Sequence, residues 1–264
     1  MRARTGGAPA RSDHGQVTGR YGEAVTSGVI RDAGLPERSR VASAGRPSWW
    51  AMGLAVLVAV LVTTDLLTVG WLERMDLRVA DTVGDWGLQD SAAYPLVWVV
   101  TQVGGRVTIL AVLAVLVGYL AWRRRTWLPL LRVLIALALL TAVVYGIKNG
   151  TGRTAPRFPG SFFFQADGAS FPSGHVANAI LMWGVARWQA VEYGLPARVQ
   201  RAFWVLSVAG PAATGLAMVS LNFHWVTDAV VGAAVGLLLL GVVHALDAVV
   251  LSRWVRARAG RRSA

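Results

Sequence analysis

The sequence contains no cysteine, only one lysine, and few charged residues for its length. Charged residues make up 15% of the 264 positions, whereas 55% are hydrophobic, and the mean hydropathy is +0.49. The missing thiols exclude disulfides, thiolate chemistry and cysteine metal sites. A soluble domain of this size needs more polar surface, so the composition predicts a protein whose solvent is a lipid bilayer.

The positive charge is unevenly distributed along the chain. All but one of the 26 basic residues are arginine, and the net charge is +12. These arginines form short clusters between long apolar runs, which is typical of a membrane protein with basic cytoplasmic loops. A nucleic-acid-binding protein would instead carry a basic face on a soluble fold, so nucleic acid is not an expected partner.

Three regions are predicted along the chain. Residues 1–47 are rich in Arg, Gly, Ser, Ala and Pro without apolar periodicity, so we expect a disordered basic tail in the cytoplasm. This stretch also lacks the apolar core of a secretory signal peptide. Residues 48–252 are predicted to form the membrane domain, and residues 253–264 a second basic cytoplasmic tail.

Six apolar segments predict an all-α bundle of six transmembrane helices. They cover about Trp49–Val69, Val107–Trp122, Trp127–Ile147, Ser173–Trp188, Ala202–Leu221 and Val226–Val250. Between the first two, residues 71–92 hold five acids and are expected to form an interfacial loop or helix outside the bilayer. A short surface helix should follow from about Tyr94, before Gly104-Gly105-Arg106.

The basic clusters also predict the orientation of these helices. With the N-terminal tail in the cytoplasm, the turn at Arg123 to Arg125, the turn at Arg198 and Arg201, and the C-terminal tail all lie inside. The acidic segment 71–92 and the loop 149–172 then lie outside. Four basic segments therefore agree with one topology, which an incorrect number of spans would hardly produce.

This topology brings His175, His224 and Lys148 to the outer membrane edge. His224 and Asp228 are spaced i, i+4, so on a helix they share one face. A carboxylate there can hold one imidazole nitrogen and leave the other free as a nucleophile or base. The same pair could instead simply cap the sixth helix, and Lys148 could simply extend its amine to the interface.

The segment Phe171-Pro172-Ser173-Gly174-His175 carries a more specific signal. Proline suits the first turn of a helix, and glycine lets the backbone approach a ligand closely. Free N–H groups at the positive end of a helix then form a ready phosphate site. An ordinary turn from loop to helix remains the alternative, but three such features converge on one face.

Together these motifs resemble the type 2 phosphatidic acid phosphatase superfamily, the lipid phosphate phosphatases. The signature of that family is K-x6-R-P, then P-S-G-H, then S-R-x5-H-x3-D. The matching segments here are KNGTGRTAP (148–156), PSGH (172–175) and AMVSLNFHWVTD (217–228). The resemblance covers about residues 94–245 and extends to the order, spacing and membrane position of the motifs.

The resemblance implies a six-span fold with an extracytoplasmic active site and a phosphohistidine mechanism that needs no metal or other cofactor. By this analogy His224 attacks phosphorus, and Asp228 orients its ring. His175 protonates the leaving oxygen and then activates water. The residues implied to hold the phosphoryl oxygens are Lys148, Ser173 and the backbone N–H of Gly174.

Three positions in two of the motifs depart from the signature. Ala155 replaces the arginine of the first motif, and Ala217-Met218 replaces the Ser-Arg of the third. In the family both arginines neutralise the phosphoryl group, and phosphoryl transfer depends mainly on such charge stabilisation. The nearby Arg153 and Arg157 are the replacements we predict as phosphate ligands. Arg106, at the outer end of its span, could also reach the pocket.

The predicted function is that of a multi-pass cell-membrane phosphatase, which cleaves a lipid phosphomonoester or pyrophosphate on the outer face. Candidate substrates are polyprenyl pyrophosphates, phosphatidic acid, phosphatidylglycerol phosphate and a polyprenyl phosphosugar. The missing arginines favour an alternative, a pseudo-phosphatase that binds anionic lipids or a membrane partner without turnover. Vanadate haloperoxidases use a related histidine site, but they are soluble proteins. Transport is a further alternative, but Asp65 and Arg132 are the only candidate charges expected deep within the membrane, which is a thin basis for an ion or substrate path.

Overall fold

The computed structural model describes residues 45–158 and 160–251, which form helices and no strand. The predicted tails fall almost entirely outside these residues. In chain order the helices are α2 (Trp49–Leu67), α3 (Trp71–Asp85), the short 3-10 helix η1 (Leu88–Asp90), α4 (Tyr94–Thr101), α5 (Arg106–Arg124), α6 (Leu128–Thr151), α7 (Gly174–Glu192), α8 (Ala197–Ser220), α9 (Val226–Leu246) and the π-helical turn η2 (Asp247–Leu251).

Five of these helices are long and apolar enough to cross a membrane: α2, α5, α6, α8 and α9, the last extended to Val249. Much of their surface is exposed and apolar, as expected for contact with lipid chains. The sixth predicted span, Ser173–Trp188, folds as α7, which is not among the five. The all-helical fold is therefore as predicted, and the crossing by α7 stays a prediction.

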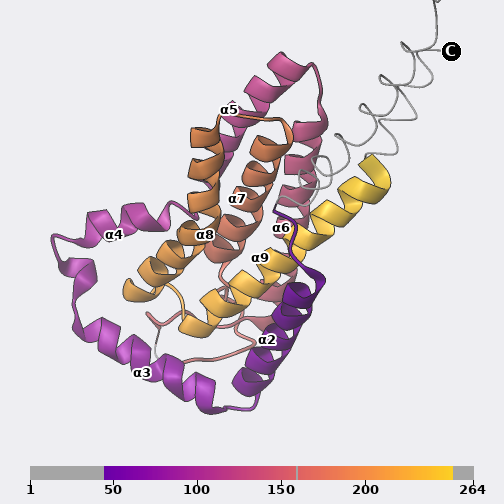
Figure 1. The fold of residues 1–264 in the computed structure, drawn as a ribbon. Coiled ribbons are helices and arrows are strands. Elements are labelled where there is room, and N and C mark those ends of the chain that lie inside the picture. The colour runs from indigo at the N-terminus through magenta and orange to yellow at the C-terminus, as the bar shows by residue number, and fades with distance from the viewer. Residues whose placement is uncertain (1–44, 159, 252–264) are drawn as a thin grey trace, which may run out of the picture. The chain divides into compact units, whose positions relative to one another are not determined.

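Helix α7 forms the centre of the bundle. It packs against α5, α6, α8 and α9, and most of its side chains are buried (Figure 1). Small residues make this close packing possible, because they let neighbouring backbones approach. At Gly236 of α9, for example, a Cβ would lie 2.7 Å from the Ala177 carbonyl oxygen of α7.

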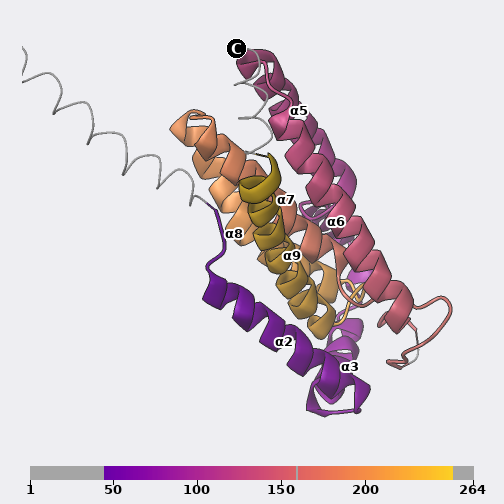
Figure 2. The ribbon, with the colours of Figure 1, turned by 90° about the vertical axis from the view of Figure 1, so that its right-hand side faces the viewer.

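The acidic segment 71–92 contains a helix, α3, which crosses near the ends of α8 and α9 (Figures 1 and 2). Its buried residues Glu73, Asp76 and Val83 follow helical spacing, so α3 turns two carboxylates inward. Asp65, in the last turn of α2, accepts hydrogen bonds from the N–H groups of Trp71 and Leu72 at 3.1 and 2.7 Å. It therefore caps the start of α3.

Arg132, in the second turn of α6, is buried and paired. Its guanidinium donates to both carboxylate oxygens of Asp247 at 2.8 Å and to both of Glu192 at 3.0 Å. It also lies 4.1 Å from the centre of the Trp188 ring. These contacts join α6, α7 and η2, so the predicted intramembrane charge of Arg132 has a structural explanation.

Candidate active site

A cavity of about 490 Å³ lies where several helices begin or end, and it contains residues of all three motifs. Lys148 comes from the last turn of α6, His175 from the first turn of α7, and His224 from the turn between α8 and α9. Gly174 also lines it. Segments far apart in the sequence therefore meet at one cavity, as the predicted topology requires.

The start of α7 is attached directly to the start of α9. The Ser173 N–H donates to the Asp228 carbonyl oxygen at 2.9 Å, which fixes the two histidine-bearing segments side by side. Gly232 makes this approach possible, since a Cβ there would lie 2.5 Å from the Ser173 carbonyl oxygen. The Ser173 hydroxyl is buried and accepts from the Val176 N–H at 3.5 Å, so it caps α7 rather than lining the cavity.

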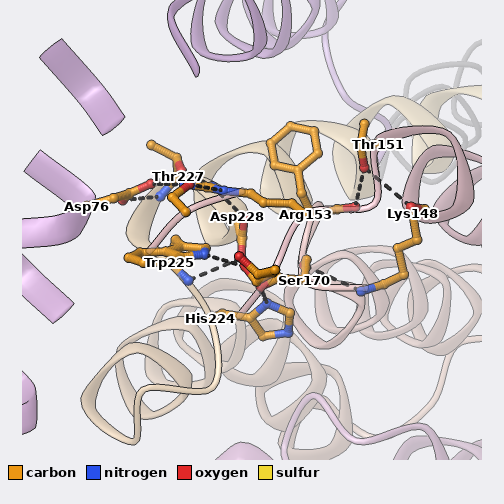
Figure 3. A network of polar contacts seen from close by, with 12 residues as sticks. Asp76, Lys148, Thr151, Arg153, Ser170, His224, Trp225, Thr227 and Asp228 are labelled. Carbon is orange, nitrogen blue, oxygen red and sulfur yellow. Dashed lines mark hydrogen bonds and ion pairs between the residues drawn. The ribbon is translucent and has the colours of Figure 1, made fainter. Parts of the chain in front are cut away.

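His224 is held by one nitrogen and presents the other. Its Nδ1 lies 3.2 Å from Asp228 Oδ2 and 3.2 Å from the Ser170 hydroxyl. We assign the proton to Nδ1, because a carboxylate can only accept. In the neutral ring Nε2 is then the nitrogen with the free lone pair, and it points away from Asp228 in Figure 3. This is the arrangement that a nucleophilic imidazole needs.

Asp228 is fully buried, and both of its carboxylate oxygens accept hydrogen bonds. Oδ1 accepts from Arg153 at 2.8 Å. Oδ2 accepts from the Trp225 N–H at 3.1 Å and from the Ser170 hydroxyl, besides His224. A buried carboxylate with this many donors keeps its charge and its direction.

Arg153 has no N–H group left for a phosphate. All five N–H groups of a guanidinium are accounted for by bonds of 2.7 to 3.2 Å, and the side chain is 0% exposed. Its acceptors are Asp76, Asp228, Thr227 and Ser161. It does not line the cavity, so the geometry corrects the prediction that it binds phosphate.

Arg157 is likewise not brought to the cavity. Its side chain is exposed, its guanidinium lies 5.3 Å from the centre of the Phe158 ring, and it lines two other hollows beside α3. Arg157 lies in the loop between α6 and α7, as the sequence predicts, but its side chain does not line the cavity. Its predicted role as a phosphate ligand is therefore not supported either.

Arg106 is the arginine that does line the cavity. Gly104, two residues before it, packs tightly against the start of α7, since a Cβ there would lie 2.6 Å from the His175 carbonyl oxygen. Asn178 of α7 donates to the Gly104 carbonyl at 2.9 Å. The start of α5 is thereby fixed beside the start of α7, and the Arg106 guanidinium lies 5.7 Å from the centre of the Tyr145 ring.

The other cation of the cavity is Lys148, whose Nζ donates to the carbonyl oxygens of Ala169 and, at 3.4 Å, Ser170. The position of the third-motif arginine is occupied by Met218, which is buried. Its carbonyl accepts the N–H groups of Phe223 and His224 at 2.9 and 3.3 Å. Met218 therefore shapes the turn that carries His224 but supplies no charge.

Sequence reasoning missed Asp76, Ser170, Asn178 and Thr227. Five acids lie in residues 71–92, and only their periodicity in a helix could have shown that Asp76 turns inward. Burial raises the pKa of Asp76 above its ordinary value, while hydrogen bonds from Thr227 and Arg153 act in the opposite direction. Among the described residues, no cluster of three or more His, Asp or Glu is arranged to hold a metal ion.

Known proteins with similar sequences or folds point to one family. The family model described as the PAP2 superfamily matches residues 129–250. Phosphatidylglycerophosphatase B of Bacillus subtilis (strain 168) is 30% identical over 152 residues, which are 56% of this chain and 72% of that protein. The crystal structure of a transmembrane PAP2-type phosphatidylglycerolphosphate phosphatase from Bacillus subtilis has the same fold, with a TM-score of 0.56 and 19% identity. The match covers 76% of this chain and 95% of the Bacillus subtilis chain.

Proposed function

This chain belongs to the PAP2 superfamily, and on that basis we propose that it is a membrane phosphatase that hydrolyses a lipid phosphomonoester or pyrophosphate through a phosphohistidine intermediate. One observation carries the proposal. His224, with Nδ1 held by Asp228, lines the same cavity as His175 and Lys148. A nucleophile, an acid and a cation are thereby available to one phosphoryl group.

The reaction has two steps. In the first, Nε2 of His224 forms a bond to phosphorus, the bond from phosphorus to the leaving oxygen breaks, and His175 gives that oxygen a proton. In the second, His175 takes a proton from water, the hydroxide attacks phosphorus, and the bond from phosphorus to nitrogen breaks. Inorganic phosphate leaves, and both histidines return to their starting state.

Charge stabilisation comes from Lys148, the Gly174 N–H and Arg106. Arg106 takes over the part that the two signature arginines play in the family, although it comes from the start of a different helix. A hydrogen bond to a charged group is worth about 1.5–3 kcal/mol, so one guanidinium can recover a large share of the loss at Ala155 and Met218.

A membrane lipid fits the surroundings of the cavity. Val107 and Tyr145 line it and are themselves exposed, on two helices that are candidate spans. Acyl or prenyl chains in the bilayer can therefore reach the cavity with the phosphate in front. The arginines at Arg123 to Arg125 lie at the other end of α5 from Arg106, which supports an extracytoplasmic site with cytoplasmic termini.

The test is phosphate release by the purified protein in detergent micelles. Three substrates are used: phosphatidylglycerol phosphate, phosphatidic acid and a polyprenyl pyrophosphate. The first is suggested by the name of the Bacillus subtilis relative. We expect release from at least one, and transfer of a labelled phosphoryl group to the protein as an acid-labile phosphohistidine. His224→Asn should abolish both, whereas His244→Asn should retain both. Release without dependence on His224 would refute the mechanism.

A second candidate is a pseudo-phosphatase that binds anionic lipids or a membrane partner. The buried Met218 and the absence of a signature arginine at Ala155 favour it. In that case the same assay gives neither phosphate nor labelled protein from any substrate. Lipid phosphates would still raise the thermal unfolding midpoint, and Lys148→Ala would remove that effect.

A further inference from the structure

A chain of buried charges connects α3 to the reacting histidine (Figure 3). Asp76 of α3 accepts from Arg153 Nη2 at 2.8 Å, and Arg153 Nη1 donates to Asp228 at the same distance. Asp228 in turn holds His224 at 3.2 Å. Asp76 is 1% exposed, and Arg153 and Asp228 are 0% exposed, so water screens these charges little.

Helix α3 and the residues after it also contact the backbone turn that carries His224. Asn222 Nδ2 donates to the Ala80 carbonyl at 3.1 Å. Gln89 of η1 donates to the Leu221 carbonyl. The turn is therefore attached to α3 and to η1 by one hydrogen bond each, in addition to the chain of charges.

Arg153 is held rigidly within this chain. Its guanidinium lies 5.4 Å from the Phe163 ring centre and 5.0 Å from that of Trp225. The Thr227 hydroxyl accepts from Arg153 at 2.7 Å and donates to Asp76. Aromatic rings and hydrogen-bond acceptors therefore fix the orientation of the planar guanidinium. Because its N–H groups are fixed, they also fix the positions of the Asp76 and Asp228 carboxylates.

We propose that Asp76 and Arg153 are positioning residues that set the direction and protonation of the His224 ring through Asp228. Neither lines the cavity, so they act through other residues rather than on the substrate. The effect on catalysis rests on the proposed function, whereas the effect on His224 itself needs no turnover. The interfacial helix α3 is thus part of the apparatus that prepares the nucleophile.

The sign of the effect follows from the surrounding charges. Removal of the Arg153 charge leaves two carboxylates uncompensated and favours the imidazolium form of His224. Removal of the Asp76 charge leaves Arg153 undercompensated and disfavours it. Charged or titratable groups face this region from every element packed around it. They are Asp76 of α3, Arg106 of α5, Lys148 of α6, Arg153 of the loop after α6, His175 of α7 and Asp228 of α9.

The decisive experiment is an NMR titration of isotope-labelled histidine in the full chain in micelles. The chain has only four histidines, and His224→Asn identifies the relevant signal. We expect Arg153→Gln to move the His224 titration midpoint upward and Asp76→Asn to move it downward, each by about one pH unit for a unit charge at an effective dielectric constant of about 20. Asp81→Asn, an exposed acid on the same helix, is the matched control and should leave it in place.

Kinetics give the second readout. Orienting partners behind metal-bound histidines are worth about 10- to 100-fold, and we expect kcat to fall by a similar factor in Asp76→Asn and in Arg153→Gln, with KM almost unchanged. The acidic limb of the pH profile of kcat/KM should move with the NMR midpoints. Arg157→Gln should change neither.

Midpoints that stay in place, or that move in the same direction in both variants, would overturn the inference. If a single variant does not fold, the double variant Asp76→Asn, Arg153→Gln removes one charge of each sign. It should keep the midpoint of the wild type while kcat falls, and an unchanged kcat would contradict a positioning role. A wild type without turnover refutes the proposed function and leaves the NMR test intact.

Discussion

The two ends of α6 carry similar arrangements of buried charge. Arg153, just beyond its end, lies between Asp76 and Asp228, and Arg132, near its beginning, lies between Glu192 and Asp247. Each guanidinium also lies over a tryptophan ring, at 5.0 Å and 4.1 Å from the ring centre. Each cluster joins elements that are distant in the sequence.

The difference lies in the histidine beside each cluster. His224 presents a nitrogen to a cavity that holds two cations. His244, with its ring centre 3.9 Å from that of Trp188, is buried, and among the described residues its Nε2 has no hydrogen-bond partner. Buried ion pairs therefore hold the helices at both ends. Of the two histidines, His224 is the one that lines a cavity with cations, which the proposed phosphoryl transfer requires.

The largest expected contrast is between His175, which lines the cavity at one end, and His244, which lies beside the Arg132 cluster at the other. In the proposed mechanism His175 is the acid and base of the two steps, so in His175→Asn phosphate release should fall by about 10²- to 10⁴-fold. His244→Asn should change release by less than about twofold, because it contacts no substrate. Initial rates of phosphate release at saturating lipid measure both. Comparable losses in the two variants would mean that the cavity is not the reaction site.

The next contrast concerns Arg132. Arg132→Met removes the buried cation between Glu192 and Asp247, and removal of one partner of a buried pair costs about 3–5 kcal/mol of stability. The thermal unfolding midpoint in micelles should therefore fall, while kcat per folded molecule stays within about twofold. A loss of kcat at temperatures where the variant remains folded would show that this end also participates in the reaction.

A smaller effect is expected for the arginine of the cavity. Arg106→Ala removes the hydrogen bond that we propose to the charged phosphoryl group, so kcat/KM should fall by about 10- to 100-fold. Arg106→Lys should recover part of this loss, because the charge remains but the bidentate geometry does not. Arg157→Ala is the control, with an expected change of less than about threefold. A larger effect at Arg157 would mean that the loop moves on binding substrate.

Most of the fold could be predicted because its signal is local. Apolar segments of about twenty residues specify spanning helices, and arginine clusters specify the alternation of their ends. The meeting of Lys148, His175 and His224 at one cavity follows from that alternation. The start of α8 at Ala197, about one turn before the predicted Ala202, shows how little the sequence marks a helix boundary.

The partners of Arg153 could not be predicted in the same way. Sequence spacing places Arg153 in the loop after α6, close to the phosphate motif, but it does not specify the direction of the side chain. Its contact with Asp76 joins positions 77 residues apart and depends on α3 crossing the start of α9. No periodic pattern records such a contact. The sequence favours Arg153 and Arg157 over Arg106 because Arg106 lies far from the motifs in the chain.

The smallest contrast is within the Arg132 cluster itself. The Glu192 side chain is 29% exposed and that of Asp247 is 11% exposed, so water screens the first ion pair more than the second. Glu192→Gln should lower the free energy of unfolding by about 1 kcal/mol or less, and Asp247→Asn by more. Thermal unfolding of the two variants in the same detergent compares them directly, and phosphate release should be unchanged in both. A reversed order would mean that hydrogen-bond geometry, rather than burial, sets the strength of this cluster.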